Sequence, residues 1–295
     1  MDDRRTITAI QVGGLAREVL SPGTRGSVTG VTSSGIFLNS TNKILFVTQA
    51  RYNSPYNIQV ETTANLSSQL IIGDDWSVEG EKIILGKTPF RIDLQAAHVW
   101  IPLPLQQIDN SKAEQVKRMS ALLDRFSEID SNKGWLFLKD AEKEAKFQTI
   151  EPDAQNIRQL TENFLDDFRQ SDLAACLDSA GHILGLGGGL TPSGDDWLTG
   201  FFLYFTRQNR QDKFMLDLGT AITSMAYERT TKISANRIEA ACRGWAEEMF
   251  LEVLDHLFTS RVELSEEQIQ RLVNFGHSSG VDTSMGILGA LSLGY

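Results

Sequence analysis

Residues 185–205 read Gly-Leu-Gly-Gly-Gly-Leu-Thr-Pro-Ser-Gly-Asp-Asp-Trp-Leu-Thr-Gly-Phe-Phe-Leu-Tyr-Phe, and they decide how the second half of the chain is interpreted. Four glycines within positions 185–189 would break any regular helix or strand. An apolar run starts at Trp197, and Ser193 followed three residues later by Asp196 predicts a capping box at a helix start. A glycine loop that leads into a helix N-terminus offers backbone N–H groups and a positive dipole end, which bind phosphate or carboxylate.

The common phosphate motifs do not match this stretch. A Walker loop needs Gly-Lys-Ser/Thr and the stretch has no lysine, while the pattern G-x-G-x-x-G meets Leu190 where it requires glycine. A loop that only joins two helices is therefore an open alternative. Asp195 and Asp196 also disfavour a bare anion, and Mg²⁺ is left open as a companion of a bound phosphate. For these two carboxylates we weigh metal binding, orientation of an amine and helix capping.

A second copy of the pattern favours a function. The two copies are Ser193-Gly194-x-Asp196-x-x-x-Gly200 and Ser279-Gly280-x-Asp282-x-x-x-Gly286. In each copy the aspartate and the last glycine lie four residues apart, on one face of a helix, where glycine allows a close backbone approach. We expect both helix starts to line one pocket at the centre of the domain.

Two polar segments accompany the copies. Residues 276–280, Gly-His-Ser-Ser-Gly, match the nucleophile-elbow pattern, but no histidine follows them and a serine hydrolase is set aside. His277 is the best-placed titratable group for donating to an anion near neutral pH. In the segment 229–234, Thr231 or Ser234 would by default cap the next helix. Alternatively, Arg229 and the neighbouring hydroxyls supply the cation and donors that the glycine loop lacks.

The first half of the chain has a different residue pattern. Short β-rich runs at 27–38, 43–48, 57–61, 69–72, 82–85 and 90–94 are separated by Gly, Asn, Asp and Pro, which is typical of an antiparallel sandwich or barrel. An amphipathic helix at about 111–130 follows, and helical periodicity continues from Pro152, with a capping box at Ser265 and Gln268. The prediction is an α+β protein. A β-rich domain at 1–150, with a bridging helix near 111–130, precedes an α-helical domain at 151–295.

Charge and composition exclude several function classes. The chain has 28 basic and 38 acidic residues, and its net charge of −10 belongs to residues 151–295, which hold 11 basic and 21 acidic side chains. Without a basic cluster we expect no nucleic-acid or anionic-membrane partner. The acidic N-terminus and the lack of a long apolar stretch favour a cytoplasmic protein. Cys176 and Cys242 are expected to be free thiols, and no metal-ligand motif occurs.

Together the motifs resemble a known bacterial family. The segments are Gly-Leu-Gly-x-Gly-Leu-Thr-Pro-Ser-Gly-Asp-Asp at 185–196, Thr-Thr-x-x-Ser at 230–234 and Gly-His-Ser-Ser-Gly-x-Asp at 276–282. They are similar to a family long described only as a domain of unknown function, some members of which are a subunit of oxamate carbamoyltransferase in anaerobic allantoin degradation, a part of purine metabolism. One departure is Gly188, which stands where the family loop has proline.

The resemblance implies a transferase subunit that works with companion subunits and moves a carbamoyl group between phosphate and the amide nitrogen of oxamate. The small anionic substrate would be of the carbamoyl phosphate, oxamate or oxalurate class, and no cofactor beyond Mg²⁺ is implied. The expected catalytic residues are Thr191, Asp195, Asp196 and His277. The expected substrate-binding residues are Gly187, Gly188, Gly189, Ser193, Gly194, Arg229, Thr230, Thr231, Ser278, Ser279, Gly280 and Asp282. The alternative is a non-catalytic assembly subunit, or one that senses an anion or nucleotide.

Overall fold

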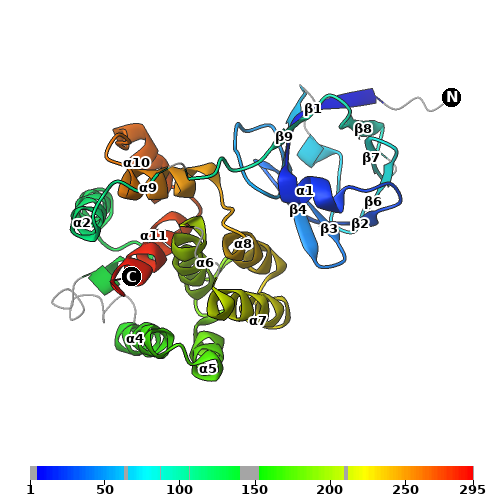
Figure 1. Ribbon diagram of the computed structural model, residues 1–295. Helices are drawn as coiled ribbons and strands as arrows, with labels where there is room; N and C mark the ends of the chain where they lie inside the picture. Colours follow the sequence, from blue (N-terminus) through cyan, green and yellow to red (C-terminus); the bar gives the residue numbers. More distant parts are fainter. Residues whose placement is uncertain are drawn as a thin grey trace. The chain divides into compact units, whose positions relative to one another are not determined.

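A computed structural model describes residues 5–62, 66–86, 88–105, 107–139, 153–208 and 212–294. The chain divides into two compact units, Met1–Pro102 and Leu103–Tyr295, which are considered separately below (Figure 1). The helix expected near 111–130 is α2 (Lys112–Ile129) and is part of the second unit. The domain boundary predicted at 150/151 falls within 140–152, outside the described residues.

The first unit is an eight-stranded closed barrel with one extra strand. Its elements are β1 (Arg5–Gly13), α1 (Gly14–Val19), β2 (Arg25–Thr32), β3 (Gly35–Ser40), β4 (Lys43–Thr48), β5 (Asn57–Glu61), η1 (Leu66–Ser68), β6 (Asp75–Glu79), β7 (Lys82–Leu85), β8 (Phe90–Asp93) and β9 (His98–Trp100). The strand order is β5-β4-β3-β2-β6-β7-β8-β1-β9, and a further pairing between β5 and β1 closes the barrel. The predicted α+β class with a β-barrel is therefore confirmed.

Closure depends on the long first strand. β1 pairs with β8 in parallel over Arg5–Thr8 and with β5 in antiparallel fashion over Thr8–Val12, with an irregularity between Ala9 and Gln11. Side chains that alternate toward the interior fill the barrel because its lumen is wide enough only for a packed core. These buried residues include Ile7, Ala9, Val28, Ile36, Leu38, Leu45, Val47, Ile58, Ile83 and Ile92.

Strand predictions in this unit were partly right. The runs at 43–48, 57–61 and 82–85 are strands with those bounds. The run at 27–38 is a hairpin of β2 and β3, because the chain turns before Gly35. Only glycine fits at position 35, since an added Cβ would lie 2.1 Å from the Val47 carbonyl oxygen. The strand predicted at 69–72 was wrong: Ile71 and Ile72 lie in an exposed turn region.

The second unit is helical. Its elements are α2, η2 (Gly134–Lys139), α4 (Ala154–Gln170), α5 (Leu173–Ile183), α6 (Ser193–Arg207), α7 (Lys213–Arg229), α8 (Lys232–Cys242), α9 (Glu248–Phe258), α10 (Glu266–Val273) and α11 (Ser279–Leu291). α6 and α11 lie side by side with the other helices around them (Figure 1). α6 is buried on nearly every face, as expected for a central helix. The capping box predicted at Ser265 and Gln268 is confirmed.

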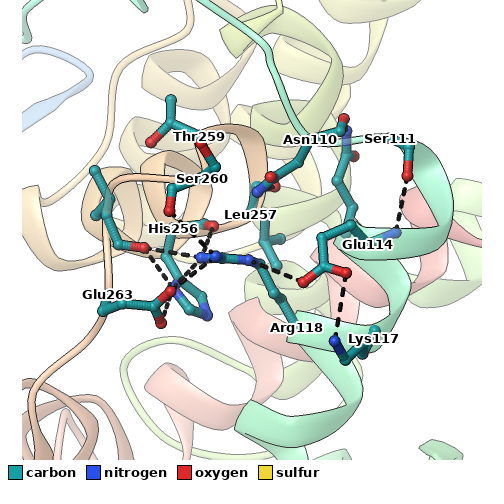
Figure 2. A network of polar contacts seen from close by, with 12 residues as sticks. Asn110, Ser111, Glu114, Lys117, Arg118, His256, Leu257, Thr259, Ser260 and Glu263 are labelled. Atoms are coloured by element: carbon teal, nitrogen blue, oxygen red, sulfur yellow. Dashed lines mark hydrogen bonds and ion pairs between the residues drawn. The ribbon is translucent and has the colours of Figure 1, made fainter.

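A half-buried arginine, Arg118, joins the helices at one side of this unit (Figure 2). The Arg118 guanidinium on α2 donates to the carbonyl oxygens of His256 at 3.0 Å and Val262 at 2.9 Å, and it pairs with Glu263 at 2.7 Å. Carbonyls at a helix C-terminus lack intrahelical partners, so this arginine satisfies the end of α9 and fixes the following loop to α2. His256 belongs to this structural network, as its position in a helical run predicted.

Two further predictions concern the cysteines and the length of the helices. Cys176 and Cys242 are free thiols, and burial raises the pKa of each to about 12, which makes them unreactive at neutral pH. Among the described residues, the helices are all too short or too polar to cross a bilayer.

Candidate functional site

The two repeated motifs meet in space. α6 begins at Ser193 and α11 at Ser279, and the hydroxyl of Thr191, just before α6, lies 2.8 Å from the hydroxyl of Ser279. Two helix N-termini that are 86 residues apart in the sequence therefore share one location. The positive ends of two helix dipoles are combined there.

The repeated glycines explain how the helices come so close. A Cβ added to Gly200 would lie 1.9 Å from the carbonyl oxygen of Thr283, and a Cβ added to Gly286 would lie 1.9 Å from the carbonyl oxygen of Trp197. Trp197 and Thr283 each follow the motif aspartate by one residue, so the two contacts are equivalent. α6 and α11 thus cross in a locally two-fold arrangement.

The first glycine of each motif, which follows the serine, packs in a similar way. A Cβ on Gly194 would lie 2.1 Å from the Ile183 carbonyl oxygen at the end of α5, and a Cβ on Gly280 would lie 1.8 Å from the Leu272 carbonyl oxygen in α10. Each helix start is therefore pressed against the end of the helix that precedes it, with no room for a side chain.

The glycine loop before α6 is open to solvent. Gly187 and Gly189 have φ angles of +109° and +91°, which L side chains rarely adopt, and space around Gly188 and Gly189 is empty. The Leu190 carbonyl is held at 2.6 Å by the Thr231 hydroxyl. Among the described residues, the backbone N–H groups of Gly187–Leu190 have no hydrogen-bond partner. The loop therefore presents several donors on an exposed rim.

Asp195 fixes this loop in place. Its side chain is fully buried, its Oδ1 accepts from the Gly185 N–H at 2.8 Å, and its Oδ2 accepts from the Thr230 hydroxyl. Burial raises the pKa of Asp195, while the bonds from Thr230 and Gly185 lower it. Because both oxygens are occupied, Asp195 connects the glycine loop to the turn between α7 and α8.

Asp196 belongs to a buried ion-pair network. Its Oδ1 accepts from Arg237 of α8, which also donates from Nε to Glu247 at 3.0 Å and from Nη2 to the Thr283 hydroxyl at 3.3 Å. Burial raises the pKa of Asp196 to about 8, since the opposing effect of Arg237 is smaller and the charge of Asp282 adds to the rise. Oδ2 of Asp196 has no hydrogen-bond partner among the described residues.

Asp282 occupies the corresponding position on α11. Its Oδ1 accepts from the Trp135 N–H at 2.6 Å, and its Oδ2, like that of Asp196, has no hydrogen-bond partner within the described part of the chain. Burial raises its pKa, whereas the Trp135 N–H, the nearby side chains of Ser278 and Ser193 and the charge of His277 act in the opposite direction.

The helix caps predicted for α6 and α8 had different outcomes. The capping box at Ser193 and Asp196 was wrong: α6 has Pro192 as its N-cap without a side-chain bond, because Asp196 turns inward to Arg237. Thr231 does cap α8, as its default reading predicted, by accepting from the Ser234 N–H at 3.1 Å.

The positive charge expected from Arg229 is directed elsewhere. A Cβ on Gly181 would lie 2.6 Å from its guanidinium, so this side chain packs along α5 rather than over the glycine loop. His277 is exposed in the turn before α11. The arginine that the site does use, Arg237, was missed. Its signal was a basic residue within the mostly small and apolar stretch 233–242 of α8, which indicates a buried charge that needs acidic partners.

The described side chains do not form a set of metal ligands. Within the described ranges, no three His, Cys, Asp or Glu side chains gather in a way that could hold a metal ion. The described residues therefore offer no group of ligands for the Mg²⁺ that the sequence left open.

Comparison with known proteins found a family that is similar to part of the second unit. Residues 183–291 match the family described as oxamate carbamoyltransferase subunit AllH. The matched segment contains the glycine loop, the 230–234 turn and both helix starts, and it confirms the family resemblance seen in the motifs. Neither the curated proteins nor the solved structures gave a match to this chain. The match supports a subunit associated with a carbamoyltransferase.

Proposed function

We propose that this chain is a carbamoyltransferase subunit that binds a small phosphate- or carboxylate-bearing ligand at the joined starts of α6 and α11. One observation carries the proposal: the segment that matches the family, 183–291, brings its separate motifs together at Thr191 and Ser279, with hydroxyl oxygens 2.8 Å apart. Motifs distant in sequence that converge on one exposed loop are typical of a ligand site.

Backbone donors would hold the anion. The N–H groups of Gly187, Gly188 and Gly189 lie in the exposed loop before α6, and those of Ser193 and Ser279 are the first N–H groups of α6 and α11. Such donors bind phosphate or carboxylate without a basic side chain. This fits a site whose buried arginine, Arg237, is already engaged by Asp196 and Glu247.

The implied chemistry is transfer of a carbamoyl group between carbamoyl phosphate and oxamate. In the direction from carbamoyl phosphate to oxamate, the oxamate amide nitrogen bonds to the carbamoyl carbon and loses a proton. The bond from the carbamoyl carbon to the phosphate oxygen breaks, and phosphate leaves. The Thr191 hydroxyl would orient the carbamoyl oxygen, and exposed His277 would manage the proton or donate to the developing charge. Thr230 and Thr231 would act through the loop that they hold.

A second candidate function is a non-catalytic subunit that binds the anion to assemble or regulate an enzyme complex. The engagement of Asp195 and Thr230 with each other and of Asp196 with Arg237 favours it, because groups committed to internal bonds are poorly placed to act on a substrate. The two functions share one ligand site and differ in turnover.

The test begins with thermal unfolding of the full chain in phosphate, carbamoyl phosphate, oxamate and nucleotides. A ligand that binds the native state raises the melting temperature as its concentration exceeds Kd. Phosphate release is then measured with and without companion subunits. Stabilisation without turnover in any combination selects the sensing subunit. Unchanged activity and stabilisation in Gly189→Val, Asp196→Ala and His277→Ala would refute the site.

A further inference from the structure

A groove lies between α4 and α11 in the second unit. Its volume is about 420 Å³, which is within the size range of small-molecule sites. The described residues that line it include neither the glycine loop nor Ser193 and Ser279, so the groove is separate from the proposed anion site. Its apolar lining consists of Leu138, Leu165, Trp197, Met285 and Leu288.

The charged side chains at the groove balance one another. They are two arginines, Arg158 and Arg169, and two carboxylates, Glu162 and Asp166, all on α4. Arg158 donates to two carbonyl oxygens of η2, at 3.0 and 3.4 Å, and Arg169 pairs with Asp166 at 2.5 Å. A charged ligand without a free partner would lose hydration against the apolar lining, so the groove favours an uncharged molecule.

Trp197 brings an unused hydrogen-bond donor to the groove. Its side chain is 1% exposed, and its indole N–H has no hydrogen-bond partner among the described residues. A buried indole N–H usually has an acceptor, and native structures leave few such groups unsatisfied. An acceptor for this group therefore has to come from outside the described residues.

The N–H edge of the indole ring borders the groove at Gly289. Phe201 stacks with the ring at 5.6 Å, and Phe164 meets it in a T-shaped contact at 5.8 Å. A Cβ added to Gly289 would lie 2.7 Å from Cζ2 and 3.6 Å from Nε1 of Trp197. Because Gly289 also lines the groove, the missing side chain at this position leaves the N–H edge open to it.

We propose that this groove is a binding site for a small, mostly apolar, uncharged molecule that carries a hydrogen-bond acceptor. The acceptor would take the N–H of Trp197, and the apolar part would pack against Met285 and Leu288. A thioether is a favourable neighbour of an aromatic ring, so ring compounds suit this lining. The inference does not depend on the proposed function, because the two sites have different lining residues.

Nuclear magnetic resonance on the full chain tests the inference through the indole N–H signal of Trp197, which Trp197→Phe assigns by removing it. The probes are quinoline and isoquinoline, which are uncharged at neutral pH and have an acceptor nitrogen. Indole is the matched probe without that acceptor. Probes of about ten non-hydrogen atoms should bind with a Kd of about 1 mM. We expect quinoline or isoquinoline to move the Trp197 signal downfield to saturation, as a hydrogen bond from the N–H requires, and indole not to do so.

Variants locate the bound probe. Leu165→Phe and Leu288→Phe each add bulk to the groove from one of its two helices and should weaken binding about tenfold. Leu216→Phe, at an exposed position of α7, is the matched control and should bind like the wild type. If one groove variant fails to fold, the other decides.

Three results would overturn the inference. Neither quinoline nor isoquinoline moves the Trp197 signal, or both groove variants bind as tightly as the wild type, or indole gives the same downfield shift as the acceptor probes. None of these results touches the proposed function, which is tested by stabilisation with small anions and by phosphate release.

Discussion

Replacing Gly200 by alanine tests the crossing of α6 and α11 directly. The new Cβ would lie 1.9 Å from the Thr283 carbonyl oxygen, about 1.5 Å closer than ordinary contact, and the obstacle is backbone that no rotamer can move. Overpacking of this kind costs about 3 kcal/mol, and the helix propensity of alanine returns about 1 kcal/mol. We expect a net loss of about 2 kcal/mol. Gly286→Ala should lose the same amount, because its Cβ meets the Trp197 carbonyl oxygen at the same distance.

Urea unfolding followed by far-ultraviolet circular dichroism reports on this unit, since all the long helices belong to it. The double variant should lose much less than the sum of the single losses, because one separation of the helices relieves both clashes. Equal midpoints for wild type and Gly200→Ala would refute the close crossing. Additive losses would show that the two contacts are independent and that the helices do not move as a pair.

Two more predictions concern the loop and the buried carboxylates. Gly188→Ala should raise the free energy of unfolding by about 0.4–1 kcal/mol, because the φ of Gly188 is not in the left-handed region and the space around it is empty. Gly189→Ala should lower it by about 1–2 kcal/mol, because Gly189 has a φ of +91°. The reverse order of the two urea midpoints would contradict the loop geometry. Burial raises the pKa of Asp196 from 3.8 to about 8, so the folded state binds this proton more tightly than the unfolded state. The resulting stability is complete below about pH 4 and is lost as the pH rises from about 4 to 8. Unfolding midpoints should therefore fall over that range and level off above it, and Asp196→Asn should flatten the decline; an unchanged slope would show that Asp196 is ionised throughout.

The barrel was predictable in kind but not in detail. Short β-rich runs separated by turn residues marked β4, β5 and β7, because apolar and β-branched residues favour strands. The closing strand β1 was missed because its pairing partners β5 and β8 are far away in sequence, and nothing local identifies them. The exposed pair Ile71 and Ile72 gave a false strand, because apolar character alone does not show that a segment is buried.

The site was predictable where glycine repeats carried the information. The repeated Ser-Gly-x-Asp pattern indicated two related helix starts, and the glycines at 200 and 286 do permit the close approach that was expected of them. The capping role of Asp196 could not be predicted correctly, because its choice between the helix start and Arg237 depends on where α8 packs. Tertiary contacts of this kind override a local capping signal.

The acidic character of residues 151–295 gives the site a specific electrostatic constraint. A net negative half of the chain repels any small anion at long range, so net charge opposes the approach of a phosphate or carboxylate ligand. Near the loop, however, Asp195 is held by Gly185 and Thr230, and Asp196 is held by Arg237, so these side chains are buried and directed inward, and burial raises the pKa of both. Their fields are offset at short range by two helix N-termini and by unpaired N–H groups. If the proposed site binds an anion, the ligand has to be small enough to lie within the reach of these dipoles, and this condition favours compact anions over polyanions.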